Sequence, residues 1–72
     1  MSTLKTEGKD WYKIQSGDLV VCVKTRDALR YFPERIGKIG IVIKRDRTSL
    51  VDLVHVDGKF MRVDLANWEK VE

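Results

Sequence analysis

Cys22 and His55 are the side chains whose types could support nucleophilic catalysis or metal binding, and each is the single residue of its kind in the chain. A Cys–His dyad would need the two residues to be neighbours across a sheet, and no third group is evident to orient the histidine. A zinc site would need more cysteine or histidine ligands than these. We therefore predict a chain that is not an enzyme and takes no metal or cofactor, with Cys22 as a small core residue.

Glycines and aspartates add no further catalytic chemistry. The segment from Gly37 to Gly40 matches neither of the glycine fingerprints that hold nucleotides. Asp52, Asp57 and Asp64 fall in expected strands or turns, where carboxylates are solvated or shape the turn. A single cysteine excludes an internal disulfide and indicates a reducing compartment, so we expect a cytoplasmic protein, or a virion or host-cytoplasm protein if it is phage-encoded.

Positive charge is concentrated in one third of the chain. The net charge is +3 over 72 residues, whereas residues 24–47 hold eight basic and three acidic side chains. Such asymmetry indicates an anionic partner, either nucleic acid or an acidic protein surface, and a merely solvated surface is the alternative. No apolar run approaches the roughly 20 residues of a membrane span, and the first residues lack the apolar core of a signal peptide.

Basic and aromatic residues interleave between Arg26 and Lys38. Pro33 favours extended geometry in the residue before it, so we expect at most one helical turn, capped by Asp27 and ending at Tyr31. Basic groups beside rings can hold phosphates while the rings stack on bases; alternatively, the rings close one end of the domain. The predicted partner-binding residues are Trp11, Tyr12, Arg26, Arg30, Tyr31, Phe32, Arg35 and Lys38. For a nucleic-acid partner, the predicted set adds Lys44, Arg45 and Arg47.

Two runs rich in Ile and Val, at residues 39–43 and 50–56, are joined by a charged segment at 44–49. β-Branched residues fit a pleated surface, so both runs are predicted strands and the pair a hairpin. Asp57-Gly58 is a tight-turn signature that leads to a third strand. The predicted strands are 19–24, 39–43, 50–56, 60–65 and 68–71, with a 3₁₀ turn over Leu65–Asn67. The last strand is expected to pair with the first and close the sheet.

The predicted strands carry more apolar side chains than one sheet face can bury. Residues 19–23 are apolar without alternation, so both faces of this strand need cover. Trp11, Tyr12 and Ile14 are the first candidates for that cover, because aromatics in a hydrophilic lead-in usually fold back onto a small domain. Apolar side chains left uncovered would form an interface. Residues 1–10 are polar and without period, which predicts a flexible arm before a domain at 11–72.

Several segments carry a family resemblance: Gly17-Asp18-Leu19-Val20, Gly37-Lys38-Ile39-Gly40-Ile41-Val42, Val56-Asp57-Gly58-Lys59, Val63-Asp64-Leu65 and Val71-Glu72. Over roughly residues 17–72 the chain resembles a KOW-type SH3-like barrel, a module of ribosomal proteins and bacterial transcription elongation factors. Gly40 ahead of Val42 is the most telling feature, since a sharply bent strand needs a backbone without Cβ. The resemblance implies an all-β, five-stranded SH3-like barrel with a long first loop, a 3₁₀ turn before the last strand and an N-terminal arm.

The chain is also similar to the small stromal SH3-like subunit of photosystem I, through Gly17–Val20, Tyr31-Phe32 and Ile39–Val42. That family docks onto a larger complex and helps an acidic electron carrier to bind. The resemblance implies a non-catalytic accessory subunit on a larger protein assembly, and a phage or bacterial accessory protein would fit the same pattern. The KOW likeness implies the alternative, a module that acts on RNA, DNA or the transcription and translation machinery. Peptide-binding SH3 domains match less well, because the acidic, tyrosine-rich first loop is missing.

Overall fold

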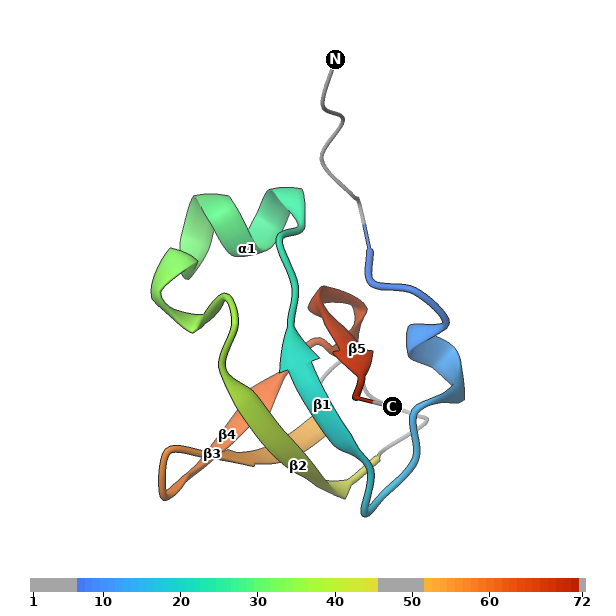
Figure 1. Cartoon of the computed structure of the whole chain (residues 1–72). Helices are drawn as coiled ribbons and strands as arrows, with labels where there is room; N and C mark the ends of the chain where they lie inside the picture. Colours follow the sequence, from blue (N-terminus) through green and yellow to red (C-terminus); the bar gives the residue numbers. More distant parts are fainter. Residues whose placement is uncertain (1–6, 46–51, 72) are drawn as a thin grey trace.

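The computed structural model describes residues 7–45 and 52–71, which form one five-stranded antiparallel sheet in the order β4-β3-β2-β1-β5 (Figure 1). The strands are β1 (Leu19–Cys22), β2 (Ile39–Lys44), β3 (Asp52–Val56), β4 (Lys59–Val63) and β5 (Trp68–Lys70). Within these described residues, helical structure is limited to α1 (Arg26–Tyr31) and to three 3₁₀ turns, η1 (Trp11–Lys13), η2 (Pro33–Arg35) and η3 (Leu65–Asn67). The predicted all-β class and the 3₁₀ turn before the last strand are confirmed.

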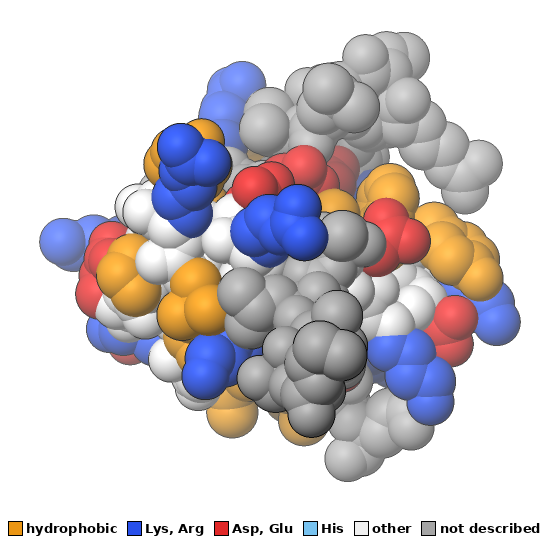
Figure 2. All heavy atoms as spheres, turned by 90° about the horizontal axis from the view of Figure 1, so that it is seen from above, with side chains coloured by type: hydrophobic (Ala, Val, Ile, Leu, Met, Phe, Trp, Pro, Cys, Tyr) orange, Lys and Arg blue, Asp and Glu red, His pale blue; other side chains and the backbone are white. Residues whose placement is uncertain are grey.

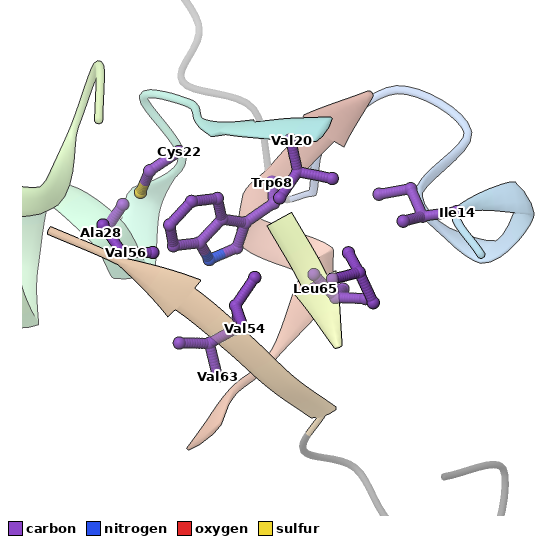
Figure 3. Close-up of a cluster of buried hydrophobic side chains, with 10 residues drawn as sticks. Ile14, Val20, Cys22, Ala28, Val54, Val56, Val63, Leu65 and Trp68 are labelled. Carbon is purple, nitrogen blue, oxygen red and sulfur yellow. The ribbon is translucent and has the colours of Figure 1, made fainter. Parts of the chain in front are cut away.

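Trp68 fills the centre of the core and is 1% exposed (Figure 3). It lies opposite Cys22 where β5 pairs with β1, so the last strand does return to the first as the sequence predicts. Val20, Val54 and Leu65 are also fully buried around this core. Inward side chains thus come from β1, β3, η3 and β5, and burial of this apolar surface stabilises the fold.

Asp57 and Gly58 form the tight turn between β3 and β4. Both residues have positive φ, 52° and 75°, as a two-residue hairpin turn of the primed kind requires. The turn sets the register of the hairpin, which pairs His55 with Phe60 and Leu53 with Arg62. The predicted connection at 44–49 lies largely outside the described residues, as do Arg47 and the first two residues of the predicted strand 50–56.

Thr25, and not Asp27, caps helix α1. The Thr25 hydroxyl accepts the backbone N–H of Ala28 at 3.1 Å and donates to Asn67 Oδ1 at 2.5 Å. Asp27 lies within the first turn and is exposed. The prediction of an Asp27 cap is therefore wrong, because the helix begins two residues earlier, where the Thr25 side chain accepts the N–H. Through Asn67 the cap also ties α1 to η3.

Residues ahead of η1 lie against β5. Gly8 is buried, and its N–H donates to the Ala66 carbonyl at 2.5 Å. The Lys9 N–H donates to the Glu69 carboxylate at 2.8 Å. Ile14 follows η1 and enters the core. The first six residues of the predicted arm lie outside the described residues.

No helix within 7–45 and 52–71 combines the length and the apolar character that crossing a membrane requires.

Candidate functional site

A row of uncovered side chains crosses the face of the sheet that points away from the core, which we call the outer face. Strand pairing aligns Leu19 with Ile41, Ile41 with His55, and His55 with Phe60, so the row runs across β1, β2, β3 and β4. Leu19 is 50% exposed, Ile41 36% and Phe60 67%. His55 is half-buried, with its ring centroid 4.8 Å from that of Phe60.

Ile39 and Ile43 extend the apolar surface along β2, at 56% and 43% exposure. Strand geometry explains the arrangement, since successive side chains point to opposite sides. In β2, Gly40 and Val42 are buried whereas the isoleucines around them are exposed. A strand that is apolar at nearly every position therefore lines the core with one set of residues and leaves the other set on the outer face.

The residues expected to cover this surface lie elsewhere. Ile14 is in the core, Trp11 packs against the core, and Tyr12 is 63% exposed. The turn η1 that carries Trp11 and Tyr12 contacts η3 and β5, whereas the row occupies β1 to β4. Among the described residues, large apolar side chains thus stay exposed on the outer face. Exposed apolar side chains gathered on one face make the outer face the candidate interaction site.

Cys22 and His55 are not brought together. Cys22 is buried on the inner side of β1, whereas His55 lies on the outer face of β3, and β2 separates the two strands. Burial raises the pKa of the Cys22 thiol above its ordinary value of 9.0, and the charge of Arg35 lowers it in part. The thiol is therefore protonated at neutral pH and shielded from solvent, which is the environment of an inert structural cysteine.

Arg45 is held inside the domain. Its guanidinium donates to the Ile14 carbonyl at 2.6 Å and to the Trp11 carbonyl at 3.2 Å, and it pairs with the buried Asp52 at 3.5 Å. It also lies 5.9 Å from the centre of the Trp11 ring. Arg45 thus anchors η1 to the end of β2, and its donors point at protein groups. Lys44, the residue before it, is exposed on the outer face.

Helix α1 and η2 carry the predicted basic and aromatic residues as two Arg–ring pairs. Arg30 lies 5.4 Å from the centre of the exposed Tyr31 ring, and Arg35 lies 5.1 Å from that of Phe32. Phe32 packs against the core, so it closes one end of the domain, whereas Tyr31 does not. Arg26 is exposed at the start of α1.

The cations on the face seen in Figure 2 do not form one continuous basic surface. On the face seen in Figure 2, Lys and Arg side chains are separated by acidic and hydrophobic ones. Lys38 forms an ion pair with Asp57, and Lys70 pairs with Asp18 at 3.8 Å. The described basic residues of the segment 24–47 are therefore divided among several places, including α1, η2 and the two ends of β2. Their charge is also partly neutralised.

Comparison of the chain with protein-family models, curated proteins and solved structures finds no match. Sequence reasoning did not name Leu19, Ile39, Ile41 or Phe60 as site residues. The signal that could have found them is the lack of alternation in the strands, combined with the register that Asp57-Gly58 imposes.

Proposed function

We propose that this chain is a non-catalytic SH3-like binding module that docks through its outer face, as a small accessory subunit, on a larger protein assembly. The observation that carries the proposal is the row of exposed apolar side chains across β1 to β4. Support for the SH3-like assignment comes from the strand order, the long connection between β1 and β2, and the 3₁₀ turn before β5. These are the features that the family resemblance implies.

The chemistry of the row favours a protein partner over nucleic acid. Most of the exposed apolar side chains of the outer face are aliphatic, namely Leu19, Ile39, Ile41 and Ile43, and burying such side chains gains about 25 cal/mol per Å² of apolar area removed from water. Bases are recognised by stacking on rings and by hydrogen bonds, which His55 and Phe60 offer at one end of the row but the aliphatic side chains do not. The centres of protein interfaces, in contrast, are apolar and depleted in charge.

A second candidate function is a KOW-type nucleic-acid-binding module, and the two Arg–ring pairs favour it. Arg30 with Tyr31, and Arg35 with Phe32, place cations beside rings on α1 and η2. Asp27 and Glu34 lie in the same elements and reduce their net charge. The nucleic-acid-binding function would use fewer free cations than the sequence suggests, because the Arg45 guanidinium is hydrogen-bonded within the domain.

Affinity purification from the organism that encodes the chain tests the proposal. Wild type would be compared with a Leu19→Thr/Ile41→Thr variant, in which threonine keeps the strand preference and removes apolar area. Tyr31→Thr, an exposed aromatic residue on α1, is the matched control. We expect nuclease-resistant partner proteins with wild type and Tyr31→Thr, and their loss with the double variant. Capture that nuclease abolishes, or that only Tyr31→Thr impairs, would support the nucleic-acid module instead.

A further inference from the structure

We infer that the outer face binds an acidic amphipathic segment of a partner protein, with apolar side chains along the row and carboxylates beside Lys44 and Arg62. The inference rests on the proposed function and adds the chemistry of the partner. It follows from where the two cations lie relative to the row, and from the ion pair that Asp57 already forms with Lys38.

Lys44 and Arg62 belong to a second row that runs parallel to the first. Pairing aligns Lys44 with Leu53 and Leu53 with Arg62, two residues along β3 from His55. A displacement of two residues along a strand is about 7 Å, so a side chain packed on the first row has these cations within reach on one flank. Both cations are exposed. Neither forms an ion pair with the residues in 7–45 and 52–71.

The acidic groups near the opposite end of this face are already engaged. Asp57 pairs with Lys38, and the Glu69 carboxylate accepts the N–H of Lys9. Lys44 and Arg62, exposed cations of the outer face that form no ion pair within 7–45 and 52–71, therefore lie on one flank of the row, whereas the Glu69 carboxylate lies on β5, beyond β1. A partner that buries the apolar row gains most if it places carboxylates on that flank, where charge complementarity adds specificity and speeds association.

Two other binding partners, a second copy of this chain and nucleic acid, fit the outer face less well. A second copy of this chain would bring the same row and the same two cations, and its Asp57 is already paired with Lys38. In such a dimer, Lys44 and Arg62 would face the same cations of the other copy or its neutralised Lys38–Asp57 pair. Nucleic acid would supply phosphates to Lys44 and Arg62 but would leave Leu19 and Ile41 against polar groups.

The length of the row determines the length of the peptide that tests the inference. Four neighbouring strands span three inter-strand distances of roughly 4.8 Å, or about 14 Å, and a helical segment of about ten residues covers that length. Random 16-residue peptides displayed on phage would be selected on immobilised wild type and on Lys44→Glu/Arg62→Glu. Arg26→Glu/Arg30→Glu, which reverses two exposed charges on α1, is the matched control. Circular dichroism would verify that each variant is folded.

We expect wild type and the α1 control to select peptides in which Asp or Glu flanks an apolar repeat. The Lys44→Glu/Arg62→Glu variant should instead select Lys or Arg at those positions. A peptide selected on wild type should bind this variant at least tenfold more weakly, and should lose binding to Leu19→Thr/Ile41→Thr. Its amide chemical-shift changes should fall on β1 to β4.

The contrary outcomes separate this inference from the proposed function. Peptides that bind the row without any charge preference would overturn the acidic partner and leave protein docking intact. Failure to select any peptide, or shift changes on α1 and η2 instead, would count against both. Sedimentation that shows a dimer broken by Leu19→Thr/Ile41→Thr would assign the face to a second copy and overturn the inference.

Discussion

Gly40 on β2 packs directly against Val56 on β3, and it shows how one missing side chain shapes this sheet. A Cβ built at this position would be 2.5 Å from Val56 Cγ2 and 3.0 Å from the His55 carbonyl oxygen. Val56 is itself buried, so it has no free space into which to withdraw. The backbone at Gly40 has ordinary φ, and close approach is therefore the reason for glycine here.

Gly40→Ala is expected to destabilise the domain by about 1–2 kcal/mol, because the new methyl group overpacks a filled core. Ile39→Ala, the exposed neighbour in the same strand, is the control and should change the free energy of unfolding by less than about 0.5 kcal/mol. Urea denaturation followed by tryptophan fluorescence measures both. An unchanged midpoint for Gly40→Ala would show that β2 and β3 can separate at no cost.

Cys22 is expected to react slowly with a thiol reagent such as DTNB in the native state. Burial both blocks access and raises the pKa of the thiol, so little thiolate is present at pH 8. Addition of urea above the unfolding midpoint should raise the rate by at least about 100-fold. A native rate equal to that of the unfolded chain would mean that the core around Trp68 opens freely.

The raised pKa of Cys22 also sets a direction for stability against pH. The unfolded thiol loses its proton near its ordinary value of 9.0, before the folded one does. This contribution to stability is therefore fully present below pH 9 and declines as the pH rises further. In Cys22→Ala, the midpoint in urea should fall less between pH 8 and pH 10 than in wild type. An equal fall in both would assign the effect to other groups.

At the scale of elements, Arg45 links parts of the chain that are distant in sequence. The backbone carbonyls of Trp11 and Ile14 turn towards it, and Asp52 at the start of β3 completes the contact. The N-terminal segment therefore depends on a cation at the end of β2. Gly8 also holds the N-terminal segment close to β5, since a Cβ there would be 2.3 Å from the Trp68 carbonyl oxygen.

Arg45→Met, which keeps the length of the side chain and removes its donors, is expected to cost about 2 kcal/mol and to loosen η1. Hydrogen exchange of the Lys13 and Ile14 amides, which donate to carbonyls within this turn, should accelerate more than exchange in β3. Lys44→Met is the control, because Lys44 is exposed. Equal exchange in Arg45→Met and wild type would show that η1 holds its position by apolar packing alone.

The strands and turns could be predicted from the sequence far better than the position and contacts of single side chains. Runs of Ile and Val and the Asp57-Gly58 pair predict β2, β3 and β4, because strand propensity and turn geometry are local properties. The sequence alone groups Arg45 with its charged neighbours as a residue for binding nucleic acid, because the carbonyls that bind it are more than 30 positions away. Tyr31 and Phe32 are adjacent and chemically alike, and only the fold determines that Phe32 turns inward.

For the whole molecule, the residues that stabilise the fold and the residues proposed to bind a partner lie on opposite faces of the sheet. Its apolar side chains contribute little to the core, so replacing them should leave folding intact and change what the surface binds. Sequence patterns alone could indicate a surplus of apolar residues but not its location, because that depends on where η1 packs.

Leu19→Thr/Ile41→Thr is expected to elute earlier from a hydrophobic-interaction column than wild type, with a change in unfolding free energy of less than about 1 kcal/mol. Val20→Thr, an inward position of the same strand, is the contrasting variant and should unfold at clearly lower urea, since it buries a hydroxyl group without a ready partner. Equal retention of wild type and the double variant would mean that the face is covered in solution.

The pairing of β1 with β5 also bears on how the chain leaves the ribosome. Cys22 and Trp68 face each other although they are 46 positions apart, so β1 is synthesised long before its partner exists. During translation its Leu and Val side chains must remain exposed, or be shielded by a chaperone, until the indole arrives. Contacts of such long range slow folding, and a nascent chain stalled before Trp68 should be a substrate for chaperones and proteases.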